Sequence, residues 1–380
     1  MTTPITAAGR QKGVMDSAAA RRAAGPVSGQ AAGQSASLAA SQQAQATHPT
    51  SVKVALLAPL SGKSASLGQA MVNAAQLAVF DMGASAFELM PRDTKGTPDG
   101  AVQAARDALG SGANLLIGPL FAADVAAVKP VVRESGVNML ALSTDVSLAD
   151  TGAFVMGFAP APQVERVISY AAEKGIKRFA AILPAGPYGQ LVGKTFEQAV
   201  YHVGGSIVAT TSPDNLENVT AHKDEIEAIF MPLGGEMLHK TTAALAQAGF
   251  EAGRVHLLGT GLWDEAGVAA HDAFLVGGWY AAPEPQARES FMKAYAETYN
   301  QSAPRLATLA YDATALAAMI ARNGGTYDIR SLCSPSGFAG LDGIFRLKAD
   351  GEIERGLAVL EVAQGAARIA DPSPNDFRGR

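Results

Sequence analysis

The chain has 380 residues, of which 48% are apolar and 17% are charged, and its formal net charge is −5. A chain of this length can bury one or two full hydrophobic cores, which predicts two domains. The slight acidic excess, without a strongly basic region, argues against nucleic acid as a partner. No apolar run approaches the roughly 20 residues that a membrane-spanning helix needs.

The residue types needed for metal or acid–base chemistry are sparse. Cys333 is the single cysteine, so the sequence excludes an intrachain disulfide and a cysteine-based metal cluster. The six histidines lack metal-ligand spacing such as HExxH. No GxSxG elbow occurs either. We therefore expect a protein that is not an enzyme, with no cofactor and no metal.

Residues 1–51 form a segment rich in Ala, Gln, Ser and Gly. Such a composition cannot bury enough apolar surface to offset the entropy of ordering, which predicts a disordered leader. Arg21 and Arg22 are similar to the start of a twin-arginine signal, but Ala-Ala-Gly-Pro follows where an apolar region belongs. Three interpretations stay open: a misplaced start codon, a removed signal, or a protein that stays inside the cell.

The stretch Gly62-Lys63-Ser64 looks like the end of a phosphate-binding loop. A Walker loop also needs a glycine five positions earlier, where this chain has Leu57. Gly193-Lys194-Thr195 fails in the same way, because Tyr188 occupies the glycine position. What remains is a strand, a polar loop and a helix start, an order that binds ligands in α/β folds. We expect Lys63 to point to solvent.

From residue 52 onward, short apolar runs alternate with helical stretches. Helical spacing of apolar residues covers 98–110, 162–174 and 236–248. The apolar runs are 52–58, 115–118, 137–142, 178–183, 206–210, 228–233, 254–258 and 275–281. This alternation predicts an α/β fold with parallel sheets covered on both faces. The segment 211–227 has little room for a crossover, which predicts a short or distorted helix.

Two segments of the chain are weakly similar to each other. Leu67–Val79 aligns with Tyr188–Val200 through Gly-Gln near the start and Ala-Val at the end, and each follows an apolar strand and a Pro/Gly loop. Two α/β lobes built alike would produce this similarity. Chance would produce it as well.

The order of several motifs resembles one family. They are Val52–Gly68 (VKVALLAPLSGKSASLG), Gly112–Leu120 (GANLLIGPL), Val137–Thr144 (VNMLALST), Tyr188-Gly189 after a strand, Gly249 after a helix, and Tyr311-Asp312-Ala313 opening into Ala315–Ala321. The chain resembles the type I periplasmic binding proteins, in their Leu/Ile/Val-binding branch, from about residue 52 to 363. Each motif is weak alone, and their order and spacing carry the resemblance.

The resemblance implies two Rossmann-like lobes with parallel sheets, joined by three hinge crossings. Lobe I maps to 52–158 plus 285–340, and lobe II maps to 159–284 plus 341–363. Residues 364–380 remain as a flexible tail. The crossings map near Gly157–Pro160, Tyr280–Pro283 and Gly340–Ile344, whose Pro and Gly content suits hinges.

The resemblance also implies site residues at the ends of strands. The family's carboxylate-binding serine falls on Ala122, beside Phe121, and the next polar loop falls on Ser143, Thr144 and Asp145. The lid aromatic falls on Tyr188. The acidic position falls on Gly261, with Asp264 close by. The candidate ligand-binding residues are Ser61, Ser64, Phe121, Ala122, Ser143, Thr144, Asp145, Tyr188, Trp263 and Asp264.

Each candidate also has a structural alternative. Ser61 is typical of a helix cap as well as of a ligand contact. Ser143 and Thr144 fit an N-cap, a role that Asp145 or Ser147 could also fill, and Tyr188 fits a ring at the surface. Of the two tryptophans, Trp263 suits a cleft and Trp279 suits a core near a hinge.

The resemblance implies a solute-binding protein that closes two lobes on a small polar, amino-acid-like ligand and serves the membrane permease of an ABC transporter in the periplasm. Asp145 would repel a ligand carboxylate, which argues against leucine-type recognition. The alternative is the related group of penicillin-binding-protein activators, which regulate a peptidoglycan synthase with a vestigial cleft. A ligand-sensing cytoplasmic domain is more distant, since 1–50 show no helix-turn-helix pattern.

Overall fold

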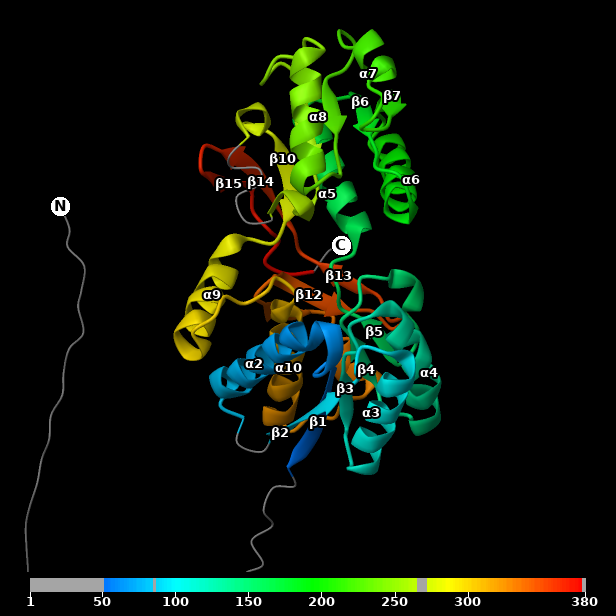
Figure 1. The fold of residues 1–380 in the computed structure, drawn as a ribbon, viewed down its shortest axis with the longest axis vertical. Helices are drawn as coiled ribbons and strands as arrows, with labels where there is room; N and C mark the ends of the chain where they lie inside the picture. Colours follow the sequence, from blue (N-terminus) through cyan, green and yellow to red (C-terminus); the bar gives the residue numbers. More distant parts are fainter. Residues whose placement is uncertain (1–50, 85–86, 265–271, 378–380) are drawn as a thin grey trace, which may run out of the picture. The chain divides into compact units, whose positions relative to one another are not determined.

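The computed structural model describes residues 51–84, 87–264 and 272–377 (Figure 1). Apart from Ser51, the predicted leader lies outside these described residues. The first lobe contains a parallel five-stranded sheet in the order β2-β1-β3-β4-β5. Its strands are β1 (Val52–Ala58), β2 (Phe87–Asp93), β3 (Leu115–Ile117), β4 (Met139–Ala141) and β5 (Ala153–Val155).

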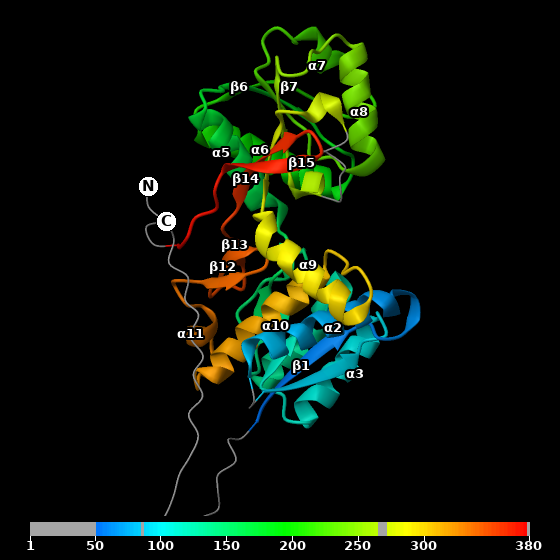
Figure 2. The ribbon, with the colours of Figure 1, turned by 90° about the vertical axis from the view of Figure 1, so that its left-hand side faces the viewer.

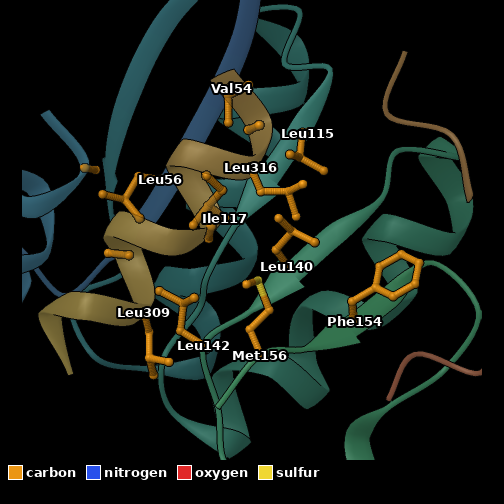
Figure 3. Packing of buried hydrophobic residues seen from close by; sticks show 14 of the residues in the cluster. Val54, Leu56, Leu115, Ile117, Leu140, Leu142, Phe154, Met156, Leu309 and Leu316 are labelled. Atoms are coloured by element: carbon orange, nitrogen blue, oxygen red, sulfur yellow. The ribbon is translucent and has the colours of Figure 1, made fainter. Parts of the chain in front are cut away.

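Helices cover both faces of the first sheet, which explains why β1 is apolar at consecutive positions. Val54 and Leu56 pack toward α2 (Ala65–Met82) and α10 (Ala307–Arg322), where Leu309 and Leu316 complete the core shown in Figure 3. Ala55 and Leu57 face the other way, toward α3 (Pro98–Gly110) and α4 (Ala122–Ser135). Alternate residues of one strand therefore serve two separate layers of side chains.

The second lobe contains a seven-stranded sheet in the order β15-β14-β10-β9-β8-β6-β7. The strands are β6 (Arg178–Ile182), β7 (Ser206–Thr211), β8 (Ala228–Phe230), β9 (His256–Gly259), β10 (Trp279–Ala282), β14 (Ala358–Ala363) and β15 (Ala366–Asp371). Within this sheet, the described pairs β10–β14 and β14–β15 are antiparallel and the others are parallel. Helices α5 (Pro160–Glu173) and α6 (Pro187–His202) pack on one face, and α8 (Gly235–Gln247) packs on the other.

The remaining elements after β10 return to the first lobe. Helix α9 (Pro285–Tyr299) packs on α2 through Phe291 and Tyr295 (Figure 2). After α10 come α11 (Ile329–Leu332) and a small antiparallel sheet of β11 (Phe338–Gly340), β12 (Gly343–Leu347) and β13 (Ile353–Arg355). Short elements complete the fold: α7 (Glu217–Ala221), η1 (Gly62–Ser64), η2 (Val146–Leu148), η3 (Gly261–Asp264) and η5 (Ala273–Leu275).

The α/β fold with two lobes of parallel strands agrees with the prediction from the sequence. The five-residue α7 is the short helix expected in 211–227. Strand β2 was missed because its sequence, FELMPRD, mixes charge and proline with apolar residues. Proline is tolerated there because β2 lies at the edge of the sheet and, among the described strands, pairs only with β1.

The chain passes between the lobes after β5, after β10 and after β13. The first two passages lie at the crossings expected near 157–160 and 280–283. The third expectation, Gly340–Ile344, is wrong, and so is the assignment of 341–357 to lobe II. Phe345, Leu347 and Ile353 belong to the core of the first lobe, so the passage falls near Gly356.

The C-terminal segment also differs from the expected flexible tail. Residues 366–371 form β15, and the following chain leads to Phe377, whose ring is buried. Both the backbone N–H and the hydroxyl of Ser373 donate to Glu284 Oε1 at 2.8 Å. The guanidinium of Arg346, on β12, lies 4.9 Å from the Phe377 ring. The chain therefore passes from the second lobe to the first lobe once more after β15.

Candidate functional site

A cavity of about 700 Å³ lies beside the first three passages between the lobes. Its wall includes Phe158 and Pro160 from the first passage, Pro283 from the second and Leu357 from the third. Most of the other lining side chains are apolar as well, among them Leu262, Met292 and Ile353. Both lobes contribute to this wall, so a molecule held here would contact both.

Three of the residues expected from the sequence line this cavity: Thr144, Tyr188 and Asp264. Tyr188 is the second residue of α6, and its hydroxyl lies 3.3 Å from Thr260 Oγ1. Burial raises the pKa of the Tyr188 hydroxyl, which the hydrogen bond with Thr260 partly opposes. The hydroxyl is therefore protonated at neutral pH and is available as a neutral hydrogen-bonding group.

Asp264 does not face the cavity as a free carboxylate. It forms an ion pair with Arg288 of α9, and both side chains are largely buried. Burial alone would lower the pKa of Arg288, but the hydrogen bond and charge of Asp264 raise it overall. Since Asp264 belongs to the second lobe and α9 packs on the first, this ion pair connects the lobes at the cavity wall.

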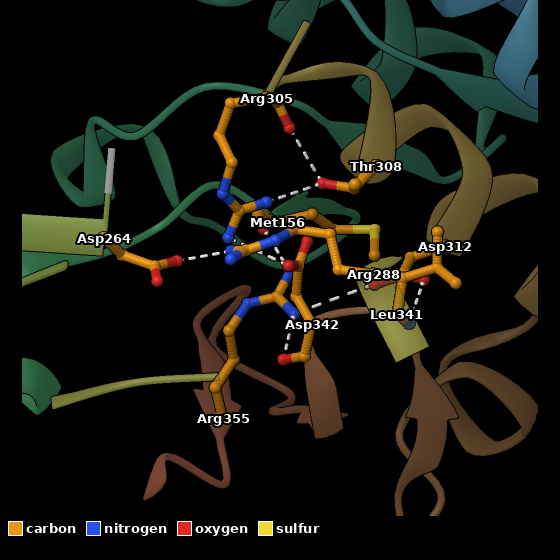
Figure 4. A network of polar contacts seen from close by, with 9 residues as sticks. All are labelled: Met156, Asp264, Arg288, Arg305, Thr308, Asp312, Leu341, Asp342 and Arg355. Atoms are coloured by element: carbon orange, nitrogen blue, oxygen red, sulfur yellow. Dashed lines mark hydrogen bonds and ion pairs between the residues drawn. The ribbon is translucent and has the colours of Figure 1, made fainter. Parts of the chain in front are cut away.

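Arg305 and Arg355 add two further charged groups to the wall (Figure 4). Arg305 contacts Asp342 Oδ1 at 2.8 Å and donates to Thr308 Oγ1 at 2.9 Å. Arg355 donates to the Met156 carbonyl at 2.8 Å. Both guanidinium groups lie over the Phe158 ring, at 4.2 Å and 5.2 Å from its centroid. These contacts fix two cations in position before any ligand arrives.

The acidic groups behind these arginines are buried. Asp312, on α10, lies 4.0 Å from Arg355 and accepts the Leu341 N–H at 2.7 Å. Burial, together with the charge of Asp342, raises the pKa of Asp312 to about 7, although Arg355 opposes the shift. The sequence did not predict a role in the site for Arg288, Arg305, Arg355 or Asp342. Arg305, two residues after Ala303 in a polar loop, carried no motif that could have revealed it.

Other predicted residues do not line this cavity. Ser61 and Ser64 flank the turn after β1, where the backbone N–H of Ser61 donates to Asp93 Oδ1 at 3.2 Å. Lys63 is exposed, as expected. Phe121 precedes α4 as its N-cap and Ala122 is the first residue of that helix. A role for them in ligand binding stays a prediction.

The polar loop after β4 has local hydrogen bonds of its own. Ser143 Oγ accepts the Asp145 N–H at 3.1 Å, and Asp145 Oδ1 accepts the Ser147 N–H at 3.1 Å as the N-cap of η2. Thr144 between them is exposed and lines the cavity. Asp145 therefore acts as a helix cap, which was its structural alternative. Thr144 is the residue of this loop that lies where it could contact a ligand.

The position of Trp263 differs from the cleft position expected from the sequence. Its side chain is buried in the core of the second lobe, where it packs near Tyr280 and against Gly259, so it does not line the cavity. Its neighbours Leu262 and Asp264 do line it. Trp279 lies in the core next to the second passage, as expected.

The described residues add two general findings. No group of three or more His, Cys, Asp or Glu side chains among them is arranged to hold a metal ion. Within 51–84, 87–264 and 272–377, every helix is too short or too polar to cross a membrane.

Two α/β lobes around a cavity at their connections define a binding protein of the periplasmic type. The chain belongs to the periplasmic binding protein family, whose model matches residues 51–367. This confirms the resemblance inferred from the sequence. The fold is that of the solute-binding proteins of ABC transporters, and the family is one of binding proteins.

Solved structures support the fold at low sequence identity. A putative branched-chain amino acid ABC transporter protein from Rhodospirillum rubrum is 19% identical, covers 84% of this chain and 99% of its own, and has a TM-score of 0.74. A solute-binding protein from R. palustris, solved with benzoate, is 19% identical, covers 86% and 98%, and has a TM-score of 0.58.

One curated relative is similar over part of its length. It is an uncharacterized protein from Rickettsia prowazekii that is 24% identical over 160 residues. The match covers 42% of this chain and 42% of that protein.

Proposed function

We propose that this protein is a non-enzymatic solute-binding protein of an ABC-type uptake system that acts in the periplasm. Its lobes would close on a small ligand, and the closed form would be recognised by a membrane permease. The observation that supports this most is the 700 Å³ cavity, to which residues of both lobes contribute. A ligand that contacts both lobes stabilises the closed form by its differential affinity for that form.

The ligand itself is part of the proposal. The sequence favours a polar, amino-acid-like molecule, and the two solved proteins described above are associated with branched-chain amino acids and with benzoate. Tyr188 and Thr144 would hydrogen-bond the polar end of such a ligand, and the apolar wall would bury its body.

Isothermal titration calorimetry of the purified protein tests this function. The panel consists of the standard amino acids, short peptides, and aliphatic and aromatic carboxylates. A dissociation constant in the micromolar range or tighter for at least one compound is expected. If no compound of the panel gave a measurable heat of binding, this result would count against solute binding.

One observation favours the alternative of a penicillin-binding-protein activator. The acidic residue nearest the family's ammonium-binding position, Asp264, is already paired with Arg288, which connects the lobes without a ligand. This alternative predicts direct binding to a purified peptidoglycan synthase, measurable by biolayer interferometry, together with no response to any compound of the panel.

A further inference from the structure

The lining of the cavity combines apolar surface with charged groups. Its apolar wall, with Phe158, Leu306 and Leu357 among its members, favours a ligand with an apolar body because burying apolar surface is favourable. Its charged lining consists of the guanidinium groups of Arg288, Arg305 and Arg355 and the carboxylate of Asp264. The charges of the lining determine which charged group of a ligand the cavity can accept.

An ammonium group has no acidic partner left to accept it. Asp264 is the acidic side chain among the described lining residues, and Arg288 already neutralises it. Gly261, at the family's acidic position, supplies no side chain. A buried ammonium without a counter-charge is strongly unfavourable, so the α-amino group of an amino acid is disfavoured here.

Arg305 offers what a carboxylate needs. Its side chain is 34% exposed at the cavity wall, while Asp342 and Thr308 engage only part of its donor set. A guanidinium group carries several N–H donors in one plane, and this geometry matches the two oxygens of a carboxylate. Phe158 below the plane and Asp342 at one edge hold the group still, so little entropy is lost when an anion binds.

The charges around Arg305 also favour an anion. Arg288, Arg305 and Arg355 face Asp264, Asp342 and Asp312, as drawn in Figure 4. Because burial disfavours the charged form of Asp312, the cluster carries a surplus of positive charge when that carboxyl is protonated. An added negative charge at this wall would balance the surplus.

We propose that the cavity binds a monocarboxylate with an apolar body, that Arg305 holds the carboxylate, and that α-amino acids are excluded by the lack of a partner for their ammonium group. This inference rests on the proposed solute-binding function. It assigns recognition of the ligand's charge to Arg305, which follows α9, and leaves Tyr188 and Thr144 as neutral hydrogen-bonding groups of the wall.

Matched probes separate the two charges in calorimetric titrations at pH 7. Leucine and 4-methylpentanoate share one carbon skeleton and differ by the ammonium group. Benzoate and benzamide share a ring and differ by the negative charge. We expect both carboxylates to bind, with leucine and benzamide at least tenfold weaker. Arg305→Gln should weaken carboxylate binding about 10- to 100-fold, the range for a lost charged hydrogen bond.

Arg346→Gln is the matched control, because Arg346 also pairs with a carboxylate, Glu354, and lies over a ring, Phe377, but is away from the cavity. It should leave the affinity unchanged. Arg305→Lys keeps the charge beside buried Asp342 and should bind with intermediate affinity. This variant keeps the test informative if Arg305→Gln does not fold, as judged by circular dichroism.

The failures are distinguishable. Leucine binding at least as tightly as 4-methylpentanoate, or carboxylate binding that survives both Arg305 variants, would overturn this inference and leave solute binding intact. If neither the four probes nor the wider panel gave a heat of binding, both this inference and the proposed solute-binding function would be overturned.

Discussion

Asp312 shows how one buried group links the cavity wall to folding stability. Its carboxyl lies between Arg355 and the backbone of the β11–β12 turn, where it accepts the Leu341 N–H. The pKa of this carboxyl rises from 3.8 to about 7, first because of burial and second because of Asp342. The folded protein therefore keeps a proton that the unfolded chain releases at a lower pH.

The sign of the pH dependence follows. Between about pH 4 and 7 the folded state binds more protons than the unfolded state, so the free energy of unfolding falls as the pH rises through this window. Above about pH 7 the effect is complete. Its full size is at most about 4 kcal/mol, from the shift at 1.36 kcal/mol per pKa unit.

Asp312→Asn removes this titration while keeping an oxygen for the Leu341 N–H. The variant should lose less stability than the wild type between pH 5 and pH 8, with a difference of at most about 3 kcal/mol. Urea unfolding of both proteins at the two pH values measures it. Equal losses in the two proteins would show that Asp312 does not titrate in this window.

Residue identity explains which site predictions were possible. Thr144, Tyr188 and Asp264 follow strands or begin helices, and these positions line ligand sites in parallel sheets, so the sequence indicated them. Arg305 and Arg355 could not be found in this way. Their role depends on Phe158 and Asp342, residues distant in sequence that only the folded chain brings together.

At the scale of elements, the two similar segments of the sequence have a common structural cause. A Cβ at Gly68 of α2 would lie 2.1 Å from the carbonyl oxygen of Pro59, and one at Gly189 of α6 would lie 1.7 Å from that of Pro184. In each lobe, the first turn of a helix packs directly against the preceding proline loop. This close approach gives the shared glycine a physical reason in both lobes, which the sequence comparison alone could not separate from chance.

This packing predicts a difference between two glycine-to-alanine changes. Gly68→Ala forces the helix and loop apart and should cost about 1–3 kcal/mol of unfolding free energy, as overpacking does. Gly110→Ala, at the end of α3, meets open space and should be neutral or slightly stabilising. Thermal unfolding of both variants is the measurement. A Gly68 variant as stable as the Gly110 variant would contradict the close packing.

The elements that were predicted correctly are those with strong apolar patterns. Strand β1 and helix α3 have the bounds that the pattern indicated. Short strands such as β5 and β11 carry too few residues to show a period. Gly340 was read as a hinge, but a Cβ there would lie 2.6 Å from Asp312 Oδ2, so it is glycine because Asp312 packs against it.

At the scale of the whole molecule, the segment after β15 contributes to stability. Phe377 is 2% exposed, whereas Phe80 on α2 is 82% exposed. Phe377→Ala should lower the free energy of unfolding by about 3 kcal/mol because it empties a packed position beside Gly337 and Arg346. Phe80→Ala should change it by less than about 0.5 kcal/mol.

Guanidinium chloride unfolding of the two variants provides the comparison. If Phe377→Ala were no less stable than Phe80→Ala, residues 372–377 would not be held against the first lobe in solution. Equal losses of stability in the two variants would also show that residues 372–377 are not held against the first lobe.

The discontinuity of the first lobe has a consequence for biosynthesis. Leu309 and Leu316 of α10 cover Val54, Leu56 and Ile117 in the folded core, yet they follow Phe154, the last large side chain of the first sheet, by more than 150 residues of chain. A ribosome adds about 5–20 residues per second. For roughly 10–30 s of each round of synthesis, α2 covers this apolar face of the sheet without α10.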